Sequence, residues 1–319
     1  MKVCLRSQLA SVLGGVAVAA VVATGAVAKD PESCKVVTFS DVGWTDITAT
    51  TAATSVVLEA LGYETDIKVL SVPVTYASLK NKDVDVFLGN WMPTMEADIR
   101  PYLDDGTVVS LGVNLEGAKY TLAVPQYTFD KGLATFENIA DFRDDLGNKI
   151  YGIEPGNDGN RLILDMIDGD AFNLKGFEIV ESSEQGMLAQ VARAVSRKED
   201  IVFLAWEPHP MNANFDLVYL PGGDDYFGPD LGGATVYTNV AAGFVEECPN
   251  VGALLQNQTF TLAMENEIMG AILDDGKEAD VAARDWLKAN PAMWEAWVDG
   301  VTTYEGGNAK EAVKAHLGK

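Results

Sequence analysis

The sequence lacks most of what metal-dependent or hydrolytic chemistry requires. Its 319 residues include only two histidines, His209 and His316, and neither stands in a metal-ligand spacing such as H-E-x-x-H. No G-x-S-x-G nucleophile elbow occurs. His209 lies between Pro208 and Pro210, so we expect it to have a structural role in a rigid turn. No metal or cofactor is expected. The acidic residues are numerous enough that composition alone does not exclude a hydrolase that uses a pair of carboxylates.

Basic residues are also scarce. Lysine and arginine number 23 against 47 aspartates and glutamates, which gives a formal charge of −24. Such a chain repels phosphate backbones, so nucleic acid is not expected as a partner. The negative charge is only weak evidence for a cationic ligand, because an acidic composition can also serve solubility alone.

Long apolar runs are confined to the N-terminus. Lys2 and Arg6 precede an uncharged run of apolar and small residues that ends in Ala26-Val27-Ala28, the pattern of a cleaved secretory signal. A retained membrane anchor is the alternative, but the run is short, rich in Ala and Gly, and has no basic flank after it. We therefore predict that residues 1–28 are a signal peptide cleaved after about Ala28, and that the mature protein is exported to the periplasm.

Cysteine is rare as well. Of three cysteines, Cys4 leaves with the predicted signal, and Cys34 and Cys248 remain. Two thiols in an oxidising compartment most simply form one disulfide, with two free buried thiols as the alternative.

Strand-like and helix-like segments alternate through most of the chain. Apolar, β-branched runs are separated by helical patterns; the runs include KVVTFS, DIKVLSV, VDVFLGN, KIYGIE, FEIVESS and IVFLAW. This alternation predicts an α/β fold with largely parallel sheets. The tail from Thr259 onward is predicted to be mostly helical, and we expect Trp286, Trp294 and Trp297 to pack there in the core or a groove.

Three other tryptophans stand where a strand gives way to a turn. They are Trp44 in FSDVGWTD, Trp91 in VFLGNWMPTM and Trp206 in IVFLAWEPHP. Ligands bind at the carboxyl ends of strands in parallel α/β sheets. Each tryptophan alone could be a core residue, but three together favour a binding site.

The segment GIEPGNDGNRLILDMID, residues 152–168, is a Gly-rich turn between a predicted strand and helix. Its free N–H groups could hold an anion or a polar ligand group. It matches neither G-x-G-x-x-G nor a P-loop, so the residues alone favour a tight turn with Asn157 or Asp158 as the helix cap.

Several motifs together resemble a known family. They are FSDVGWTDITATTA, VLSVPVTYASLKNKDVDVFLGNWMPTME, NLEGAKYTLAV, YGIEPGNDGNRLILDMID, ESSEQGMLAQVARA, GGDDYFGP and GGATVYTN. Across the whole mature chain they are similar to choline-binding proteins of bacterial ABC importers, within the glycine betaine/proline/choline group of periplasmic substrate-binding proteins. The resemblance implies a type II two-lobed α/β fold with two crossing hinge segments. We expect lobe one to comprise 29–115 and 213–319, and lobe two 116–212.

The resemblance also assigns a site. The family's aromatic box falls on Trp44, Trp91, Tyr120 and Trp206, the residue that meets the choline hydroxyl on Asp46, the polar residue of the Gly-rich turn on Asn157, and the paired cysteines on Cys34 and Cys248. Aromatic faces suit a trimethylammonium group, which has no N–H to donate. The resemblance implies a monomer that is not an enzyme. This protein would capture choline, and acetylcholine more weakly, and deliver it to the membrane permease of an ABC importer.

Two alternatives compete with choline capture. A glycine betaine or proline betaine protein of the same family would need donors for the ligand's carboxylate, whereas an ionised Asp46 would repel it. A secreted hydrolase of choline esters would need a nucleophile and a base in the cleft, and His209 is the only histidine before the helical tail.

Overall fold

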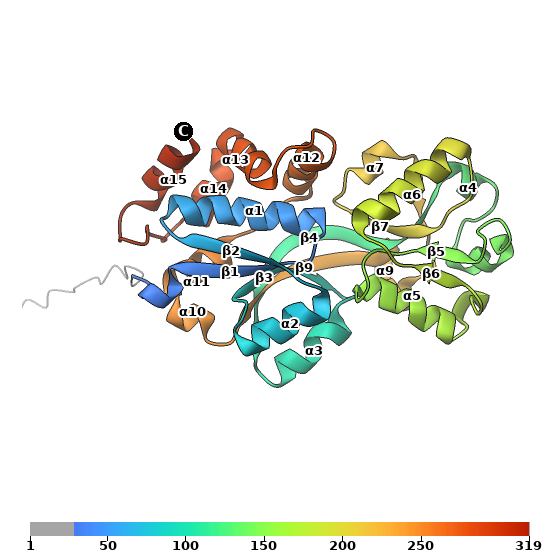
Figure 1. The fold of residues 1–319 in the computed structure, drawn as a ribbon, viewed down its shortest axis with the longest axis horizontal. Coiled ribbons are helices and arrows are strands. Elements are labelled where there is room, and N and C mark those ends of the chain that lie inside the picture. The colour runs from blue at the N-terminus through green and yellow to red at the C-terminus, as the bar shows by residue number, and fades with distance from the viewer. Residues whose placement is uncertain (1–28, 319) are drawn as a thin grey trace, which may run out of the picture.

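The computed structural model describes residues 29–318. The predicted signal peptide, residues 1–28, lies outside the described residues. Two lobes lie side by side along the longest axis of the molecule (Figure 1). This arrangement agrees with the predicted two-lobed α/β fold.

The first lobe holds the chain's beginning and end. Its strands β1, β2 and β3 are parallel, in the order β2-β1-β3. Helices α12 to α15 lie over α1 on one side of the sheet, and α2 and α3 lie on the other (Figure 1). The elements are η1 (Glu32–Cys34), β1 (Val36–Asp41), α1 (Thr45–Ala60), β2 (Glu64–Val69), α2 (Val72–Asn81), β3 (Val86–Met92), α3 (Glu96–Asp104), α10 (Phe244–Glu247), α11 (Pro249–Asn257), α12 (Leu262–Leu273), α13 (Ala279–Ala289), α14 (Pro291–Trp297) and α15 (Ala309–Leu317).

The second lobe is built from the middle of the chain. Its strands β5, β6 and β7 are also parallel, with β5 in the centre. Its elements are α4 (Gln126–Asp130), η2 (Phe136–Phe142), β5 (Lys149–Tyr151), α5 (Asp158–Asp168), η3 (Ala171–Asn173), β6 (Glu178–Val180), α6 (Glu184–Arg197), β7 (Phe203–Glu207), α7 (Met211–Asn214), β8 (Leu217–Tyr219), α8 (Asp224–Phe227) and α9 (Pro229–Gly232).

Two long strands, β4 (Val108–Pro125) and β9 (Gly233–Ala241), cross between the lobes (Figure 1). β9 pairs with β3 of the first lobe and with β4, and β4 goes on to pair with β7 and β8 of the second. All of these pairings are antiparallel. The prediction of largely parallel sheets therefore holds inside each lobe and is wrong for the strands that join them, since each crossing strand must run back alongside its neighbour.

The second predicted boundary, at residue 213, stays a prediction, and the contacts of the segment after it suggest a later position. β8 pairs with the end of β4, at Ala123–Pro125, and Phe227 of α8 packs edge-on against Tyr120 with ring centroids 6.0 Å apart. The segment 213–232 therefore lies against the second lobe, and its Leu220 and Phe227 side chains are buried. We propose that the second crossing begins at about residue 233, where β9 starts; the first boundary, at 115/116, stays a prediction.

A disulfide joins Cys34 and Cys248, as predicted, with the two Cα atoms 5.7 Å apart. It links the end of η1 to the residue just before α11, and both cysteines are buried. Both ends lie in the first lobe. The bond therefore fixes the two ends of that lobe's chain to each other and does not cross between lobes.

Helix α1 runs through the middle of the first lobe. Thirteen of its residues are buried, among them small side chains such as Ala49 and Ala53 that let neighbouring helices approach. In the helical tail, Trp294 and Trp297 are buried and Trp286 is partly buried, as expected.

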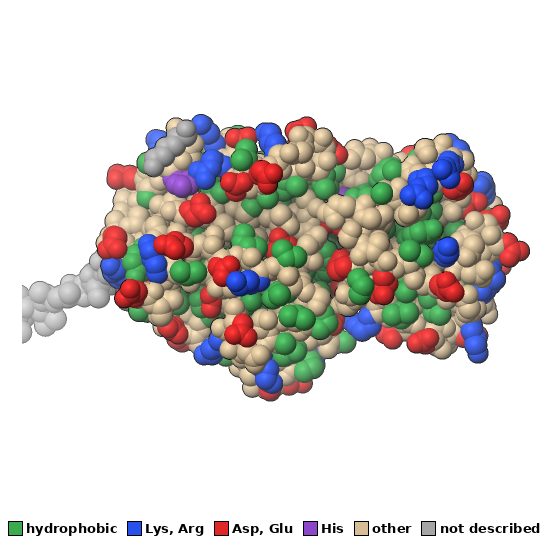
Figure 2. Space-filling view, in the orientation of Figure 1, with side chains coloured by type: hydrophobic (Ala, Val, Ile, Leu, Met, Phe, Trp, Pro, Cys, Tyr) green, Lys and Arg blue, Asp and Glu red, His purple; other side chains and the backbone are tan. Residues whose placement is uncertain are grey.

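No helix within residues 29–318 is long and apolar enough to cross a membrane. The same residues contain no group of three or more His, Cys, Asp or Glu side chains arranged to hold a metal ion. On the face shown in Figure 2, acidic side chains are spread over both lobes and are not gathered at one end.

Candidate functional site

A small pocket lies between the two lobes. The space between the protein atoms there is about 250 Å³, open solvent included, so the pocket fits only a small molecule. All six residues predicted for the site line it, together with two that were not predicted: Trp44, Asp46, Trp91, Tyr120, Asn157 and Trp206, with Ile153 and Asp158. Their role as ligand contacts stays a prediction.

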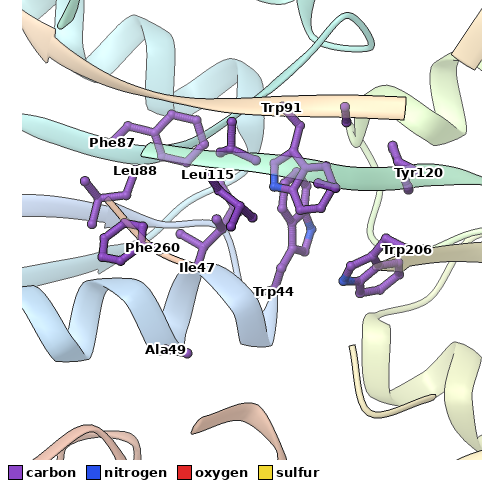
Figure 3. Close-up of a cluster of buried hydrophobic side chains, with 14 of the residues drawn as sticks. Trp44, Ile47, Ala49, Phe87, Leu88, Trp91, Leu115, Tyr120, Trp206 and Phe260 are labelled. Carbon is purple, nitrogen blue, oxygen red and sulfur yellow. The ribbon is translucent and has the colours of Figure 1, made fainter. Parts of the chain in front are cut away.

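Strand ends position the three tryptophans. Trp91 and Trp206 are the next-to-last residues of β3 and β7, and Trp44 immediately precedes α1. Gly43, at φ +82°, makes the turn that brings Trp44 back toward the sheet, a conformation that other residues rarely adopt. Figure 3 shows these rings and Tyr120 gathered where α1 begins and β3, β4 and β7 pass.

Three of the four rings, those of Trp91, Tyr120 and Trp206, meet edge to face. The ring centroids of Trp91 and Tyr120 are 6.1 Å apart at 64°, and those of Tyr120 and Trp206 are 6.3 Å apart at 81°. Each ring is no more than 5 % exposed. Because rings at such angles support one another and leave faces free, the cluster can present several electron-rich faces to one small group.

Asp46 is the acidic side chain that lies against the rings in the pocket. Its Oδ2 accepts a hydrogen bond of 3.2 Å from Nε1 of Trp91, whereas its Oδ1 is buried without a hydrogen-bond partner in the protein. Burial, and then the nearby charge of Glu184, raise the pKa of Asp46 to about 8. A cation beside it would favour the ionised form, and a hydroxyl group could donate to Oδ1.

Asn157 has two functions in the structure. Its Oδ1 accepts from the backbone N–H of Asn160 and so caps α5, and it also accepts from the Tyr120 hydroxyl at 2.8 Å. The cap expected from the residues alone is therefore present, and the same side chain faces the pocket. It fixes the Tyr120 ring through its hydroxyl, which burial keeps protonated by raising the tyrosine pKa well above its usual value.

Asp158 is a second carboxylate on the pocket wall, which the resemblance did not assign. Its Oδ1 accepts from Nδ2 of Asn157 at 3.1 Å, and its Oδ2 is buried without a partner. Burial raises its pKa to about 6. Lysine and arginine side chains do not line the pocket in the described part of the chain.

Two further carboxylates hold the start of α1 from outside the pocket. Glu154, from the second lobe, accepts from Nε1 of Trp44 at 2.5 Å, and burial raises its pKa to about 7. Glu184, at the start of α6, accepts from Thr45. Sequence reasoning missed both because these pairs are 110 and 139 residues apart, and no local pattern joins them.

His209 is structural, as expected. It is 2 % exposed, and its ring packs against that of Trp206 with centroids 4.9 Å apart. Its Nδ1 accepts from the backbone N–H of Met211, so the proton of the neutral ring is on Nε2, 3.1 Å from Oε1 of Glu184. Neither nitrogen is free to act as a base in the pocket.

Comparison with protein families agrees with this architecture. The model for the substrate-binding domain of ABC-type glycine betaine transport systems matches residues 35–289. The chain belongs to this family.

Solved structures of family members superimpose on the chain. An ABC-transporter choline-binding protein in complex with choline is 66 % identical; the match covers 90 % of this chain and all of that one, with a TM-score of 0.89. The unliganded semi-closed form of an ABC-transporter choline-binding protein, at the same identity and coverage, gives 0.83. The lactococcal OpuAC protein in its closed form with glycine betaine is 25 % identical over 82 % of this chain and 98 % of that one, with a TM-score of 0.75.

Proposed function

We propose that this protein captures choline between its two lobes and delivers it to the membrane permease of an ABC importer. The observation that carries the proposal is the pocket itself: three indoles and a phenol surround a carboxylate that has one oxygen unpaired. A trimethylammonium group binds to ring faces, each contributing about 0.5–2 kcal/mol. Four such contacts, not strictly additive, supply much of the ~8 kcal/mol of micromolar binding.

Asp46 favours choline over betaines. Its Oδ1 can accept a hydrogen bond from the choline hydroxyl, and its charge attracts the cation. Betaine instead brings a carboxylate, which would meet Asp46 and Asp158 with neither lysine nor arginine on the described pocket wall to bind it. Acetylcholine keeps the cation but lacks the hydroxyl, so we expect it to bind more weakly.

The pocket does not favour a choline-ester hydrolase. Its lining includes neither serine, cysteine nor histidine among the described residues, and both nitrogens of His209 are already engaged. We therefore propose a non-enzymatic monomer that needs no cofactor and acts in the periplasm after its signal peptide is removed.

Calorimetry tests the proposal. The ligand-free protein is titrated with choline, acetylcholine, glycine betaine and proline betaine under one set of conditions. We expect choline to bind tightest, in the micromolar range or below, and acetylcholine to follow. Tighter binding of either betaine would make the protein a betaine carrier, and turnover of acetylcholine or phosphocholine by the pure protein would show an enzyme.

A further inference from the structure

Glu184 stands at the contact between the lobes but not on the pocket wall. Its side chain is fully buried at the first residue of α6 in the second lobe. Its Oε2 accepts from the backbone N–H of Thr45 at 2.7 Å, and its Oε1 accepts from the Thr45 hydroxyl at 2.6 Å. Thr45 is the first residue of α1 in the first lobe. Both hydrogen bonds therefore exist only while the lobes are together.

The donors suit a carboxylate. The Thr45 amide is one of the N–H groups that a helix leaves unpaired in its first turn, and the positive end of the α1 dipole adds to the attraction. His209 completes the set by donating from Nε2 at 3.1 Å. With three donors, a buried carboxylate is compensated, whereas separation of the lobes removes the two from Thr45.

The same contact joins two parts of the aromatic box. Thr45 stands between Trp44 and Asp46 in the chain, and His209 packs its ring against Trp206. Glu184 thus connects the turn that carries one tryptophan and the pocket carboxylate to the strand end that carries another. None of its atoms needs to touch the ligand for this.

We propose that Glu184 is a positioning residue that holds the lobes together over the ligand through Thr45, while His209 keeps the Glu184 carboxylate in place. The proposal rests on the proposed function, because the retained ligand is taken to be choline. Glu184 should therefore slow ligand dissociation without changing association. The bonds between Glu184 and Thr45 must break before the ligand leaves, whereas the ligand enters before those bonds form.

Two threonines on α1 provide a matched test. The Thr48 hydroxyl donates to Oδ2 of Asp41 at 2.7 Å, a carboxylate of the first lobe, whereas the Thr45 hydroxyl donates across the lobes. Thr45→Val and Thr48→Val each remove one hydroxyl-to-carboxylate bond without changing side-chain shape. Loss of a hydrogen bond to a charged group changes an equilibrium constant by roughly tenfold or more.

Choline association and dissociation rates are measured by stopped-flow tryptophan fluorescence. We expect Thr45→Val to dissociate about tenfold faster with nearly unchanged association, and Thr48→Val to match the wild type in both. Thr45→Ser, which keeps the hydroxyl, should restore slow dissociation. Equal dissociation rates in Thr45→Val and Thr48→Val would overturn the proposal, as would a Thr45→Ser variant as fast as Thr45→Val.

A ligand-independent measurement separates this proposal from the proposed function. Dyes at cysteines replacing the exposed Asp83 and Lys175, one in each lobe, report lobe separation by energy transfer in ligand-free protein. We expect a larger mean separation in Thr45→Val than in Thr48→Val. If the wild type fails to bind choline, the proposed function fails, and the two separations alone decide: equal separations would refute the role of Glu184.

Discussion

At the residue scale, we propose that the pocket separates two kinds of recognition. The rings would bind the trimethylammonium group that choline, acetylcholine and betaine share, whereas Asp46 would contact the part of the ligand that distinguishes them. Trp91 donates to one oxygen of Asp46 and leaves the other unpaired, so the carboxylate is held in place and still able to accept. Affinity and selectivity should therefore respond to different substitutions.

Replacing Trp206 with Ala removes one ring face. We expect choline, acetylcholine and betaine to lose affinity together, by roughly 1–2 kcal/mol, and more if water enters. Calorimetry of the three ligands should give a choline-to-betaine ratio close to that of the wild type. A loss confined to one ligand would show that this ring face is not shared.

Asp46→Asn leaves the rings in place and replaces the carboxyl group with a neutral amide of nearly the same shape. Choline should lose about 1.5–3 kcal/mol with the charge-assisted bond to its hydroxyl, whereas betaine should lose nothing or gain. The measured quantity is again the ratio of choline to betaine affinity, which should drop. An unchanged ratio would mean that Asp46 does not meet the hydroxyl.

The sequence predicted the residues that face the pocket better than those that support them. Trp44, Trp91 and Trp206 follow visible strand patterns, and the resemblance added Tyr120 and Asn157. Glu154 and Glu184 were not predicted, because an acidic residue on an acidic chain carries no signal until folding brings it to a donor more than a hundred residues away.

At the scale of elements, the crossing strands decide where the lobes meet. β4 contains register shifts at Ser110/Gly112, Val113/Leu115 and Leu115/Ala118 as it leaves the first lobe. The strand-to-helix alternation predicted each lobe's parallel sheet. It did not predict the antiparallel crossing, because a long irregular strand with glycines inside has no distinct pattern of its own.

Reduction of the Cys34–Cys248 disulfide should affect the first lobe alone. The bond closes a separation of 214 residues, and constraint of the unfolded chain should contribute roughly 2–5 kcal/mol. We expect the melting temperature to fall by roughly 5–15 °C in the reduced, alkylated protein, with choline affinity nearly unchanged. Calorimetry and a binding titration measure the two effects. An equally large loss of affinity would show that the bond also supports the pocket.

At the scale of the whole molecule, enclosure by two lobes requires their movement. A ligand surrounded by rings from both lobes enters only when they separate, and its binding should favour a closed state already accessible to the free protein. Small-angle scattering should show a smaller radius of gyration with choline than without it. The same radius in both samples would contradict a closing movement.

The raised pKa values of the buried carboxyl groups should make the free energy of unfolding depend on pH. Burial raises the pKa of Asp46 to about 8, of Glu154 to about 7 and of Asp158 to about 6, against about 4 in an unfolded chain. Between pH 4 and 8 the folded protein therefore holds more protons than the unfolded one, so the free energy of unfolding should fall as pH rises and level off above 8.

Choline should reduce this dependence, because its charge favours ionised Asp46. Melting temperatures at pH 5, 6.5 and 8, with and without choline, measure it, and stabilisation by choline should be largest at pH 8. In Asp46→Asn the fall without ligand should be smaller than in the wild type. A ligand-free melting temperature that rises from pH 5 to pH 8 would contradict the claim that these carboxyl groups are buried in their protonated form.

The central claim is that the rings bind a cation and not merely a group of its shape. The most direct measurement compares choline with 3,3-dimethyl-1-butanol, which has the same shape and hydroxyl but a neutral carbon in place of nitrogen, by calorimetry on the wild-type protein. Loss of several cation–π contacts should weaken the neutral compound by more than about 100-fold. Affinities within a few fold of each other would show that the pocket recognises shape and apolar surface alone, which would contradict recognition through cation–π contacts.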